Sequence, residues 1–546
     1  MILITNIKFG YESIYSIVIN EVLNLVPRIN STNDPPFLNH LEWEALYHSF
    51  EIPKYENLKT RLLPLGSKKI VVSRDEEYKI KGLLTGHCEN SLPLTPLMEG
   101  DPYMPMPREN IKIPELEGEY EIDYLIKLKK TKHGPDGVDF EAEMDISHLK
   151  RTFDQSDKLC WLTEWFLNGT NIAYDGIISN ELEKKYTRKM NKPENPNLEH
   201  SSELNVIFSD LSVNYTQENS ETKGYLFVEF PDENGTDKYF TIQSVPDNYG
   251  PPWSKNISIE YKGKWWIPTP EERKKISEIV SFLIGRQLIS IGYTKFNKKG
   301  KVIEDFVNSP KISEGIHLQE LCKSKFYFSP VNTLEDETFH NLRSYFKELI
   351  PKYFALRDDL NLNEVLGKYW LSKAIPNEAE IIILAASLEL LFNSWYKSKN
   401  SKSQGNFLSK KKFREVFTEE LDRIENKLDT LEWQFPDFKK RFYNKLENSN
   451  QMGFNASIHF FFKEIGLNIG EIEKKAIQSR NDPVHGHILK TDELDEMIKM
   501  TLAYRTLVNR TILKVLGYNG EYVDYYRAID PIPIEEYMRH IDEPIQ

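Results

Sequence analysis

The pattern of apolar and polar positions changes near the middle of the chain. In the first half, "EYEIDYLIKLKK" (119–130) alternates with a period of two, as expected for a half-buried strand. Residues 67–84 hold two β-prone runs separated by a charged turn, and 224–245 has the pattern of a hairpin around Asp232–Gly235. A further strand is expected within 256–268. These patterns predict a β-rich N-terminal region.

A helical period begins at 269–288, where Thr269 is the predicted N-cap, Pro270 the first helical residue and Glu272 the partner in a capping box. From about Leu334 onward amphipathic helices predominate. The segment 378–396, with Asn377 as its predicted cap, is apolar almost all round. Such a helix belongs at the centre of a bundle or in an oligomer interface.

The sequence therefore predicts a multidomain α+β protein, in which a β-rich N-terminal region is followed by a C-terminal α-helical bundle. A chain of 546 residues is too long for one domain. We expect a β-rich sensor or regulatory domain at 1–265 and a mixed, mostly helical connecting region at 266–375. The bundle should occupy 376–518, and 519–546 forms an acidic, tyrosine-rich tail.

The amino-acid composition predicts a folded, cytoplasmic protein. A hydrophobic fraction of 40% is ample for packed cores. Cys88, Cys160 and Cys322 are odd in number and far apart, so they predict no disulfide framework and favour a reducing, cytoplasmic location. The N-terminus lacks a signal-peptide pattern, and the apolar run 380–392 contains charges and is short for a membrane span. The net charge of −13 argues against extended coating by nucleic acid but permits a small basic site.

The stretch "SRNDPVHGH" (479–487) concentrates the candidate chemistry. Arg480 follows Ala476 by four positions and Ile477 by three, so it projects near the buried face of its helix. Pro483 ends that helix, and the chain then returns His485 towards the bundle. The alternative is a purely structural role, in which Arg480 donates hydrogen bonds to the last carbonyls of the helix and His485 is an ordinary loop residue.

An arginine and a histidine in one cleft suit phosphodiester chemistry. Guanidinium holds phosphate oxygens bidentately, and imidazole, with an ordinary pKa of about 6.5, transfers a proton near neutral pH. RNA supplies its own nucleophile, the 2′-hydroxyl, and general acid–base catalysis contributes roughly 10²–10⁴-fold. We therefore expect no cofactor and no metal, and the sequence has no His-Glu-x-x-His motif.

Arg480-Asn481-Asp482-Pro483-Val484-His485 matches the Arg-x4-His signature of HEPN ribonucleases. The helix before it, the long helix pattern at 491–517 and "AASLELLFNSWY" (385–396) fit the same fold. The C-terminal part resembles most the ApeA-like HEPN group of bacterial anti-phage proteins. Pro483 departs from the aliphatic residue of many members, and His487 has no counterpart in the motif.

The resemblance implies a homodimer through the HEPN bundle, in which two motifs form one metal-independent endoribonuclease site. Arg480 and His485 carry over as catalytic residues and Asn481 as their polar support. The implied function is abortive infection: the N-terminal domain senses a phage-derived trigger and otherwise restrains RNA cleavage. The alternatives are a non-catalytic HEPN-like module that binds RNA or nucleotide or drives oligomerisation, and a carbohydrate- or peptide-recognising β protein with a helical oligomerisation domain.

Three smaller features of the sequence each have two interpretations. Residues 397–414 hold seven basic residues and no acidic one. They form an RNA-backbone contact or a solvated loop, and the proposed RNA-binding residues are Lys410, Lys411, Lys412 and Arg414. His87-Cys88 is the start of a metal site or an ordinary loop. Glu389 orients an active-site group or is a polar position at the bundle surface.

Overall fold

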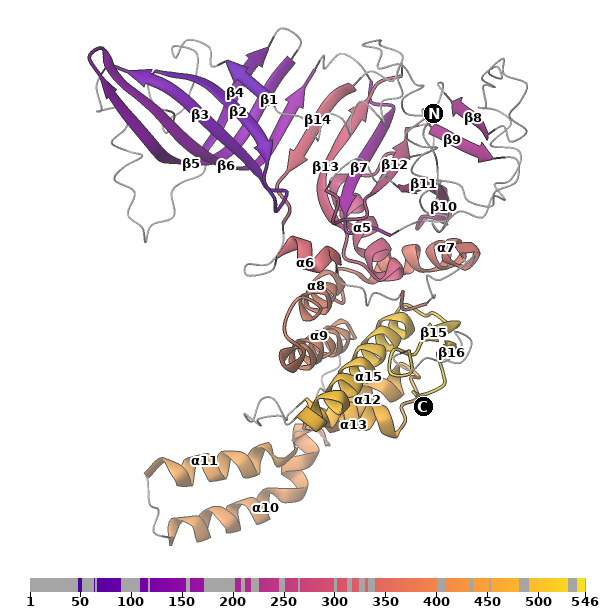
Figure 1. Ribbon diagram of the computed structural model, residues 1–546. Helices are drawn as coiled ribbons and strands as arrows, with labels where there is room; N and C mark the ends of the chain where they lie inside the picture. Colours follow the sequence, from indigo (N-terminus) through magenta and orange to yellow (C-terminus); the bar gives the residue numbers. More distant parts are fainter. Residues whose placement is uncertain are drawn as a thin grey trace. The chain divides into compact units, whose positions relative to one another are not determined.

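The computed structural model (Figure 1) divides into two compact units, Met1–Tyr327 with Leu334–Lys347 and Phe328–Thr333 with Glu348–Gln546. The residues that the structure describes are 48–51, 63, 66–89, 109–115, 118–153, 158–170, 202–207, 212–217, 225–244, 251–263, 266–298, 302–311, 317–323, 329–331, 339–399, 408–431, 436–450, 453–480, 491–528 and 538–545. The region 266–375 is shared between the two units.

The first unit is built mainly from β-strands. They are β1 (His48–Glu51), β2 (Ser67–Arg74), β3 (Ile80–Cys88), β4 (Glu109–Glu115), β5 (Gly118–Gly134), β6 (Gly137–Thr152), β7 (Trp161–Leu167), β8 (Ser202–Ile207), β9 (Ser212–Gln217), β10 (Tyr225–Pro231), β11 (Asp237–Ser244), β12 (Ile257–Lys262), β13 (Ile289–Phe296) and β14 (Val302–Asn308). Its helices are α5 (Pro270–Ile284), α6 (Leu318–Lys323) and the beginning of α7 (Phe339–Leu356).

One large antiparallel sheet runs in the order β1-β2-β3-β6-β14-β13-β7-β12-β11-β10. β5 pairs with β6 along most of its length and carries β4, and β8 pairs with β9 separately. The predicted strands at 67–84, 119–130 and 256–268 are confirmed, as is the hairpin at 224–245. In its turn, Asp232 Oδ1 accepts hydrogen bonds from the amides of Asn234 and Thr236, each at 2.9 Å.

Helix α5 packs on the part of the sheet formed by β7, β12 and β13 (Figure 1). Its predicted capping box is confirmed: the Thr269 amide donates to Glu272 Oε2 at 2.7 Å, and the Glu272 amide donates to Thr269 Oγ1 at 3.3 Å. Arg273 of α5 donates from Nε to Glu164 of β7 at 2.9 Å, and Tyr261 of β12 donates to the same carboxylate at 3.2 Å. Of these strands, β7 and β12 are buried along their whole length, whereas β13 has one exposed residue, Ser290.

The second unit is helical with a small antiparallel ribbon near its end. Its elements are the rest of α7, α8 (Leu362–Ser372), α9 (Asn377–Ser398), α10 (Lys410–Asp429), α11 (Pro436–Glu447), the 3₁₀ turn η3 (Asn448–Asn450), α12 (Phe454–Glu464), α13 (Glu471–Ser479), α15 (Thr491–Val515), β15 (Glu521–Val523) and β16 (Met538–His540). The α+β fold class is thus correct at the level of a β-rich part followed by a helical part.

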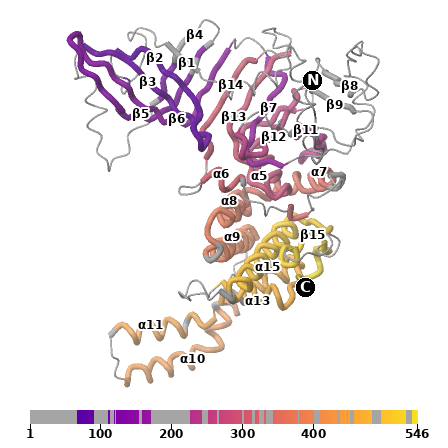
Figure 2. Tube along the Cα trace, viewed as in Figure 1, coloured from indigo at the N-terminus to yellow at the C-terminus, as the bar shows by residue number. Residues whose placement is uncertain are grey.

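Helix α9 packs against α8, α12 and α15, which confirms its predicted central place. The colours of Figure 2 show α9, from the middle of the sequence, beside α15, from near its end. The prediction that Asn377 caps this helix is wrong. Pro376 occupies the N-cap position, and its carbonyl accepts from the amides of Ala379 at 2.9 Å and Glu380 at 3.1 Å, so the helix begins one residue earlier.

The helix that contains the apolar run 380–392 is longer than that run. Residues Ala379–Ser398 are long and apolar enough to cross a membrane by length and composition alone. Packing against α8 and α15 gives its apolar character another explanation, that of a core helix.

Candidate active site

Arg480 lies at the C-terminus of α13, as the sequence predicts. It is the C-cap residue, with helical φ and ψ of −57° and −24°, and its amide donates to the carbonyl of Gln478. Ala476 and Ile477, one turn earlier, are 0% and 1% exposed and form the apolar side of α13. Arg480 itself is half-buried and its Nε atom is fully buried. The side chain therefore starts from the packed face of the bundle.

The other predicted motif residues, Asn481 and His485, lie outside the described residues, as do Pro483 and His487. The structure thus places one half of the Arg-x4-His motif. α15 follows that segment and runs from Thr491 to Val515 as one continuous helix, close to the prediction of 491–517. Arg480 is therefore located at a junction between two packed helices.

Tyr504, on α15, is a described side chain on which the Arg480 charge acts. It is fully buried, and its hydroxyl makes no hydrogen bond within the described part of the chain. Burial raises the pKa of Tyr504 well above its ordinary value, the Arg480 cation lowers it, and the Glu389 carboxylate raises it. The charges of Arg480, at the end of α13, and Glu389, on α9, thus both act on Tyr504 of α15.

The sequence does not identify Tyr504 as part of this site. Met500, Leu507 and Val508 on the same helix are buried, so an aromatic residue among them has the appearance of ordinary core. The electrostatic effect of Arg480 on Tyr504 depends on the packing of α13 against α15, which the spacing of residues along the chain does not show. Glu389 is exposed, which fits a polar position at the bundle surface and leaves it accessible to the site.

Arg505 fixes α15 to α9 and α8. It is 4% exposed and donates from Nε to Glu380 Oε1 of α9 at 3.1 Å and from Nη2 to Ser372 Oγ of α8 at 3.0 Å. Its guanidinium carbon also lies 5.0 Å from the centre of the Tyr369 ring. A planar cation with several fixed donors suits such a junction. These contacts set the position of Tyr504 relative to the helix that carries Glu389.

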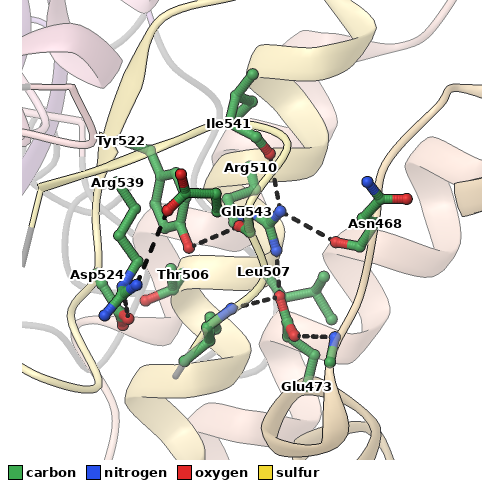
Figure 3. Close-up of polar contacts among 12 residues, drawn as sticks. Asn468, Glu473, Thr506, Leu507, Arg510, Tyr522, Asp524, Arg539, Ile541 and Glu543 are labelled. Carbon is green, nitrogen blue, oxygen red and sulfur yellow. Dashed lines mark hydrogen bonds and ion pairs between the residues drawn. The ribbon is translucent and has the colours of Figure 1, made fainter.

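Arg510 fixes α15 to α13 and to the C-terminal segment (Figure 3). Arg510 and Glu473 are both 0% exposed and form an ion pair. Arg510 Nη2 also donates to the carbonyls of Asn468 at 3.0 Å and Ile541 at 2.8 Å. Glu473 in turn accepts hydrogen bonds from the backbone amides of Gly470 and Ile545. The buried pair therefore has several backbone partners, as buried ions require, while Nε of Arg510 has none among the described residues.

The electrostatics of Glu473 follow from this arrangement. Burial raises its pKa, whereas the Arg510 cation and the Gly470 and Ile545 amides lower it. Because Glu473 stands in the first turn of α13, the pair fixes the direction in which this short helix runs. The orientation of Arg480, at the other end of α13, follows from it.

The predicted RNA-binding cations lie on a different element. Lys411, Lys412 and Arg414 are exposed in the first turns of α10, whose N-cap Ser409 accepts a hydrogen bond from the Lys412 amide at 3.2 Å. Lys410 begins the helix. These residues are helical, and they belong to the α10–α11 hairpin instead of the α13–α15 junction.

The His87-Cys88 pair forms no recognisable metal site. His87 Nδ1 lies 2.7 Å from Asp139 Oδ1 and its Nε2 lies 3.1 Å from the Asp136 carbonyl, while Cys88 is 4% exposed. Among the described residues, no group of three or more His, Cys, Asp and Glu side chains is placed to hold a metal ion.

A cavity of about 470 Å³ lies in the first unit, at the N-terminal end of α5. Leu162, Ile267 and Pro270 contribute apolar walls, and Arg273 and Lys295 contribute cations. Each cation already has a carboxylate partner: Arg273 pairs with Glu164 at 2.9 Å, and Lys295 with Glu304 at 2.7 Å. The cavity thus has room for a small molecule but carries no unbalanced charge.

The site around Arg480 brings a half-buried cation, a buried phenol and an exposed carboxylate together from three helices held by two buried arginines. Such an arrangement presents a positive group at a helix junction and keeps it in a defined orientation. Comparison of the chain with protein-family models, curated proteins and solved structures gives no match.

Proposed function

We propose that the helical unit is a metal-independent endoribonuclease in which Arg480 and His485 carry the chemistry. The observation that supports the proposal most is the position of Arg480. It ends a helix that is oriented by the fully buried Glu473–Arg510 pair, and its charge acts on the buried Tyr504. A side chain held in this way loses little rotamer freedom when it binds a phosphate. This favours a phosphate-binding role for Arg480 over a role limited to capping the helix.

The proposed reaction is attack of the RNA 2′-oxygen on the adjacent phosphorus, with cleavage of the bond to the 5′-oxygen. His485 removes the 2′-hydroxyl proton or protonates the departing oxygen, and Arg480 stabilises the negative charge that develops on the phosphoryl oxygens. Asn481 supports the two. The products are a 2′,3′-cyclic phosphate, or the 3′-phosphate formed from it, and a 5′-hydroxyl.

The resemblance to HEPN proteins also implies the context of this reaction. Two copies of the motif form one composite site in a homodimer, and the β-rich unit restrains cleavage until a phage-derived trigger arrives. Because unrestrained RNA cleavage harms the host, activation stops both cell growth and phage production. This is the proposed role in abortive infection, in the cytoplasm.

The test uses the purified full chain and labelled RNA, with a chelator present. Arg480→Ala and His485→Ala should each abolish cleavage and cellular toxicity while leaving the circular dichroism spectrum unchanged. Arg480→Lys, which keeps the charge but loses the bidentate fork, should retain only part of the activity. Lys298→Ala, which removes an exposed cation from the first unit, is the matched control. Full activity in both alanine variants would falsify the nuclease proposal.

A second candidate function is binding without catalysis, and the cavity at the end of α5 favours it. Its volume of about 470 Å³ is large enough for a small ligand, which suits a β-rich unit that recognises a molecule while the bundle only assembles. Native mass spectrometry of the purified chain distinguishes the two. A bound small molecule together with no RNA cleavage under any activating condition supports this second candidate.

A further inference from the structure

Helices α10 and α11 form an antiparallel hairpin whose side chains are almost all solvent-exposed (Figure 1). Among the described side chains of α10, only Leu428 is buried, at 6% exposure, and no described side chain of α11 is buried. The exposed large apolar residues of the hairpin are Val416 at 55%, Phe417 at 39%, Leu431 at 57%, Phe438 at 41% and Phe442 at 46%. Two helices alone therefore leave much of their apolar surface in water.

The hairpin is nevertheless a formed element. At its base, Asn450 is 5% exposed, donates to the Leu408 carbonyl at 2.8 Å and accepts from the Leu408 amide at 2.9 Å. At the opposite end, Lys439 of α11 pairs with Asp429 of α10. Both ends of the hairpin are thus closed, and its exposed apolar surface is presented by a defined structure.

The charges on α10 are sorted along its length. Residues 410–414 carry four cations and no carboxylate, whereas 415–429 carry six carboxylates and two cations. Lys439, Lys440 and Arg441 of α11 stand beside the acidic half and offset part of it, and Asp437 adds another carboxylate there. Residues 415–429 and 436–441 together carry seven carboxylates and five cations. The base of the hairpin is therefore basic, and the longer part towards its tip is weakly acidic.

A surface with this distribution is complementary to itself. When two identical hairpins pair about a two-fold axis with their α10 helices antiparallel, the basic base of each lies along the acidic tip of the other. The four helices then bury the exposed apolar side chains between them, as in a four-helix bundle. Exposed apolar residues rimmed by charges are the usual sign of such an interface.

RNA is the other partner that the basic turn suggests, and the observations favour it less. The acidic half of α10 begins directly after the basic turn, so its carboxylates lie about a Debye length or less from any phosphate bound there and repel it. The exposed apolar residues are also left unexplained by phosphate contact. We infer that the α10–α11 hairpin is a self-association surface whose partner is the same hairpin of a second copy of this chain.

This inference does not depend on nuclease activity. A hairpin interface and the dimer through the bundle that the HEPN resemblance implies are separate contacts. Where both form, the particle holds more than two chains, and loss of the hairpin contact halves its mass. Where only the hairpin contact forms, its loss yields monomers.

The experiment measures the mass of the full chain by light scattering and sedimentation at several concentrations. Lys411 and Arg414 share one flank of α10 with Asp422 and Glu425. We expect Lys411→Glu with Arg414→Glu to halve the particle mass at concentrations where the wild type is assembled, with at least a tenfold weaker self-association constant, because like charges then face each other. Asp422→Lys with Glu425→Lys should do the same.

Two combinations of these substitutions make the test specific. The chain that carries all four substitutions should recover assembly, because its two halves are again complementary. An equimolar mixture of the two double variants should also assemble, one acidic hairpin with one basic hairpin. Lys127→Glu with Lys130→Glu, exposed cations of β5, makes the same charge change elsewhere and should leave the mass unaltered. Val416→Ser with Phe442→Ser tests the apolar component and should weaken assembly without changing the helix content.

Three results overturn the inference. One is a wild-type chain that is monomeric throughout, and another is a particle mass that the double variants do not change. The third is a failure of the four-fold variant and of the mixture to recover assembly while circular dichroism shows intact helices. Unchanged mass together with weaker RNA binding in the Lys411→Glu, Arg414→Glu variant assigns the basic turn to RNA instead.

Discussion

Tyr504 illustrates how a single buried hydroxyl can mark a site. Its hydroxyl has no hydrogen bond within the described residues, yet burying such a group without one is unfavourable for folding. Unlike other such hydroxyls, the Tyr504 phenol is acted on by the charges of both Arg480 and Glu389, which connects it with the candidate site.

We therefore expect Tyr504→Phe to leave the free energy of unfolding within about 1 kcal/mol of the wild type, because it removes a hydroxyl that makes no bond. RNA cleavage should fall by about tenfold, equivalent to ~1.4 kcal/mol, because the phenol dipole next to the guanidinium is lost. Chemical denaturation and cleavage rates measure the two effects. Tyr396→Phe, which removes another buried hydroxyl without a hydrogen bond within the described residues, is the matched control and should not affect cleavage.

His87 gives the first unit a pH-dependent contact. Its hydrogen bond to Asp139 is the largest cause that raises its pKa above 6.5, and the Asp136 carbonyl raises it further. A raised folded-state pKa contributes stability that is fully present below the unfolded pKa and is lost as pH rises through the folded pKa. Because the side chain is accessible to solvent, the effect on stability is small.

NMR titration of the His87 ring should accordingly give a pKa above 6.5 in the wild type. Asp139→Asn should bring that pKa down towards the ordinary value, since it removes the carboxylate. An unchanged pKa in the variant contradicts the assignment of the shift to Asp139.

Sequence reasoning could place residues whose contacts lie close by in the chain. It could not place residues whose partners lie far along the chain. The direction of Arg480 follows from its spacing to Ala476 and Ile477, which is a local property of one helix. Glu473 has an equally local pattern, that of an acidic residue in a first helical turn, but its partner Arg510 is far along the chain. The spacing of residues along the sequence therefore predicts neither this ion pair nor the contribution of Tyr504.

At the scale of elements, α15 is the organising helix of the second unit. Arg505 holds α9 and α8, and Arg510 holds α13 and the segment around Ile541. The capping box that begins α5 was predictable because all its atoms lie within one turn. The start of α9 was not, because Pro376 can serve as an N-cap through its carbonyl alone.

Glu473→Gln should destabilise the helical unit by about 3–5 kcal/mol, since it leaves the Arg510 charge buried without its counter-ion. Chemical denaturation followed by far-ultraviolet circular dichroism measures the loss. The double variant Glu473→Leu, Arg510→Met should cost less than Glu473→Gln, because no unpaired charge then remains buried. A Glu473→Gln chain as stable as the wild type would show that the pair has little structural role.

At the scale of the whole molecule, each compact unit has its own core and its own buried ion pair. The first contains Glu164 with Arg273, and the second contains Glu473 with Arg510. In the first unit, fully buried residues on β2, β3, β5 and β6 form a further apolar cluster, among them Ile70, Leu84, Ile122, Ala142 and Met144. We therefore expect each unit to open independently of the other.

Hydrogen exchange read by mass spectrometry should show this separation. Glu164→Gln should speed exchange in peptides from β7, β12 and α5 and leave α13 and α15 unaffected, because the uncompensated Arg273 charge lies in the first unit only. Glu473→Gln should give the reverse pattern. Faster exchange across both units from either substitution contradicts independent cores.

The buried contacts of Arg510 and Glu473 also set an order of events during synthesis. Ile541 and Ile545 are translated after all of α13 and α15, yet their backbone atoms complete the hydrogen bonding of the pair. Until that segment has left the ribosome, two opposite charges face each other with part of their hydrogen bonding unmade, and the orientation of α13 is not yet enforced. A nascent chain thus completes α13 and α15 before the hydrogen bonding that orients Arg480 is complete.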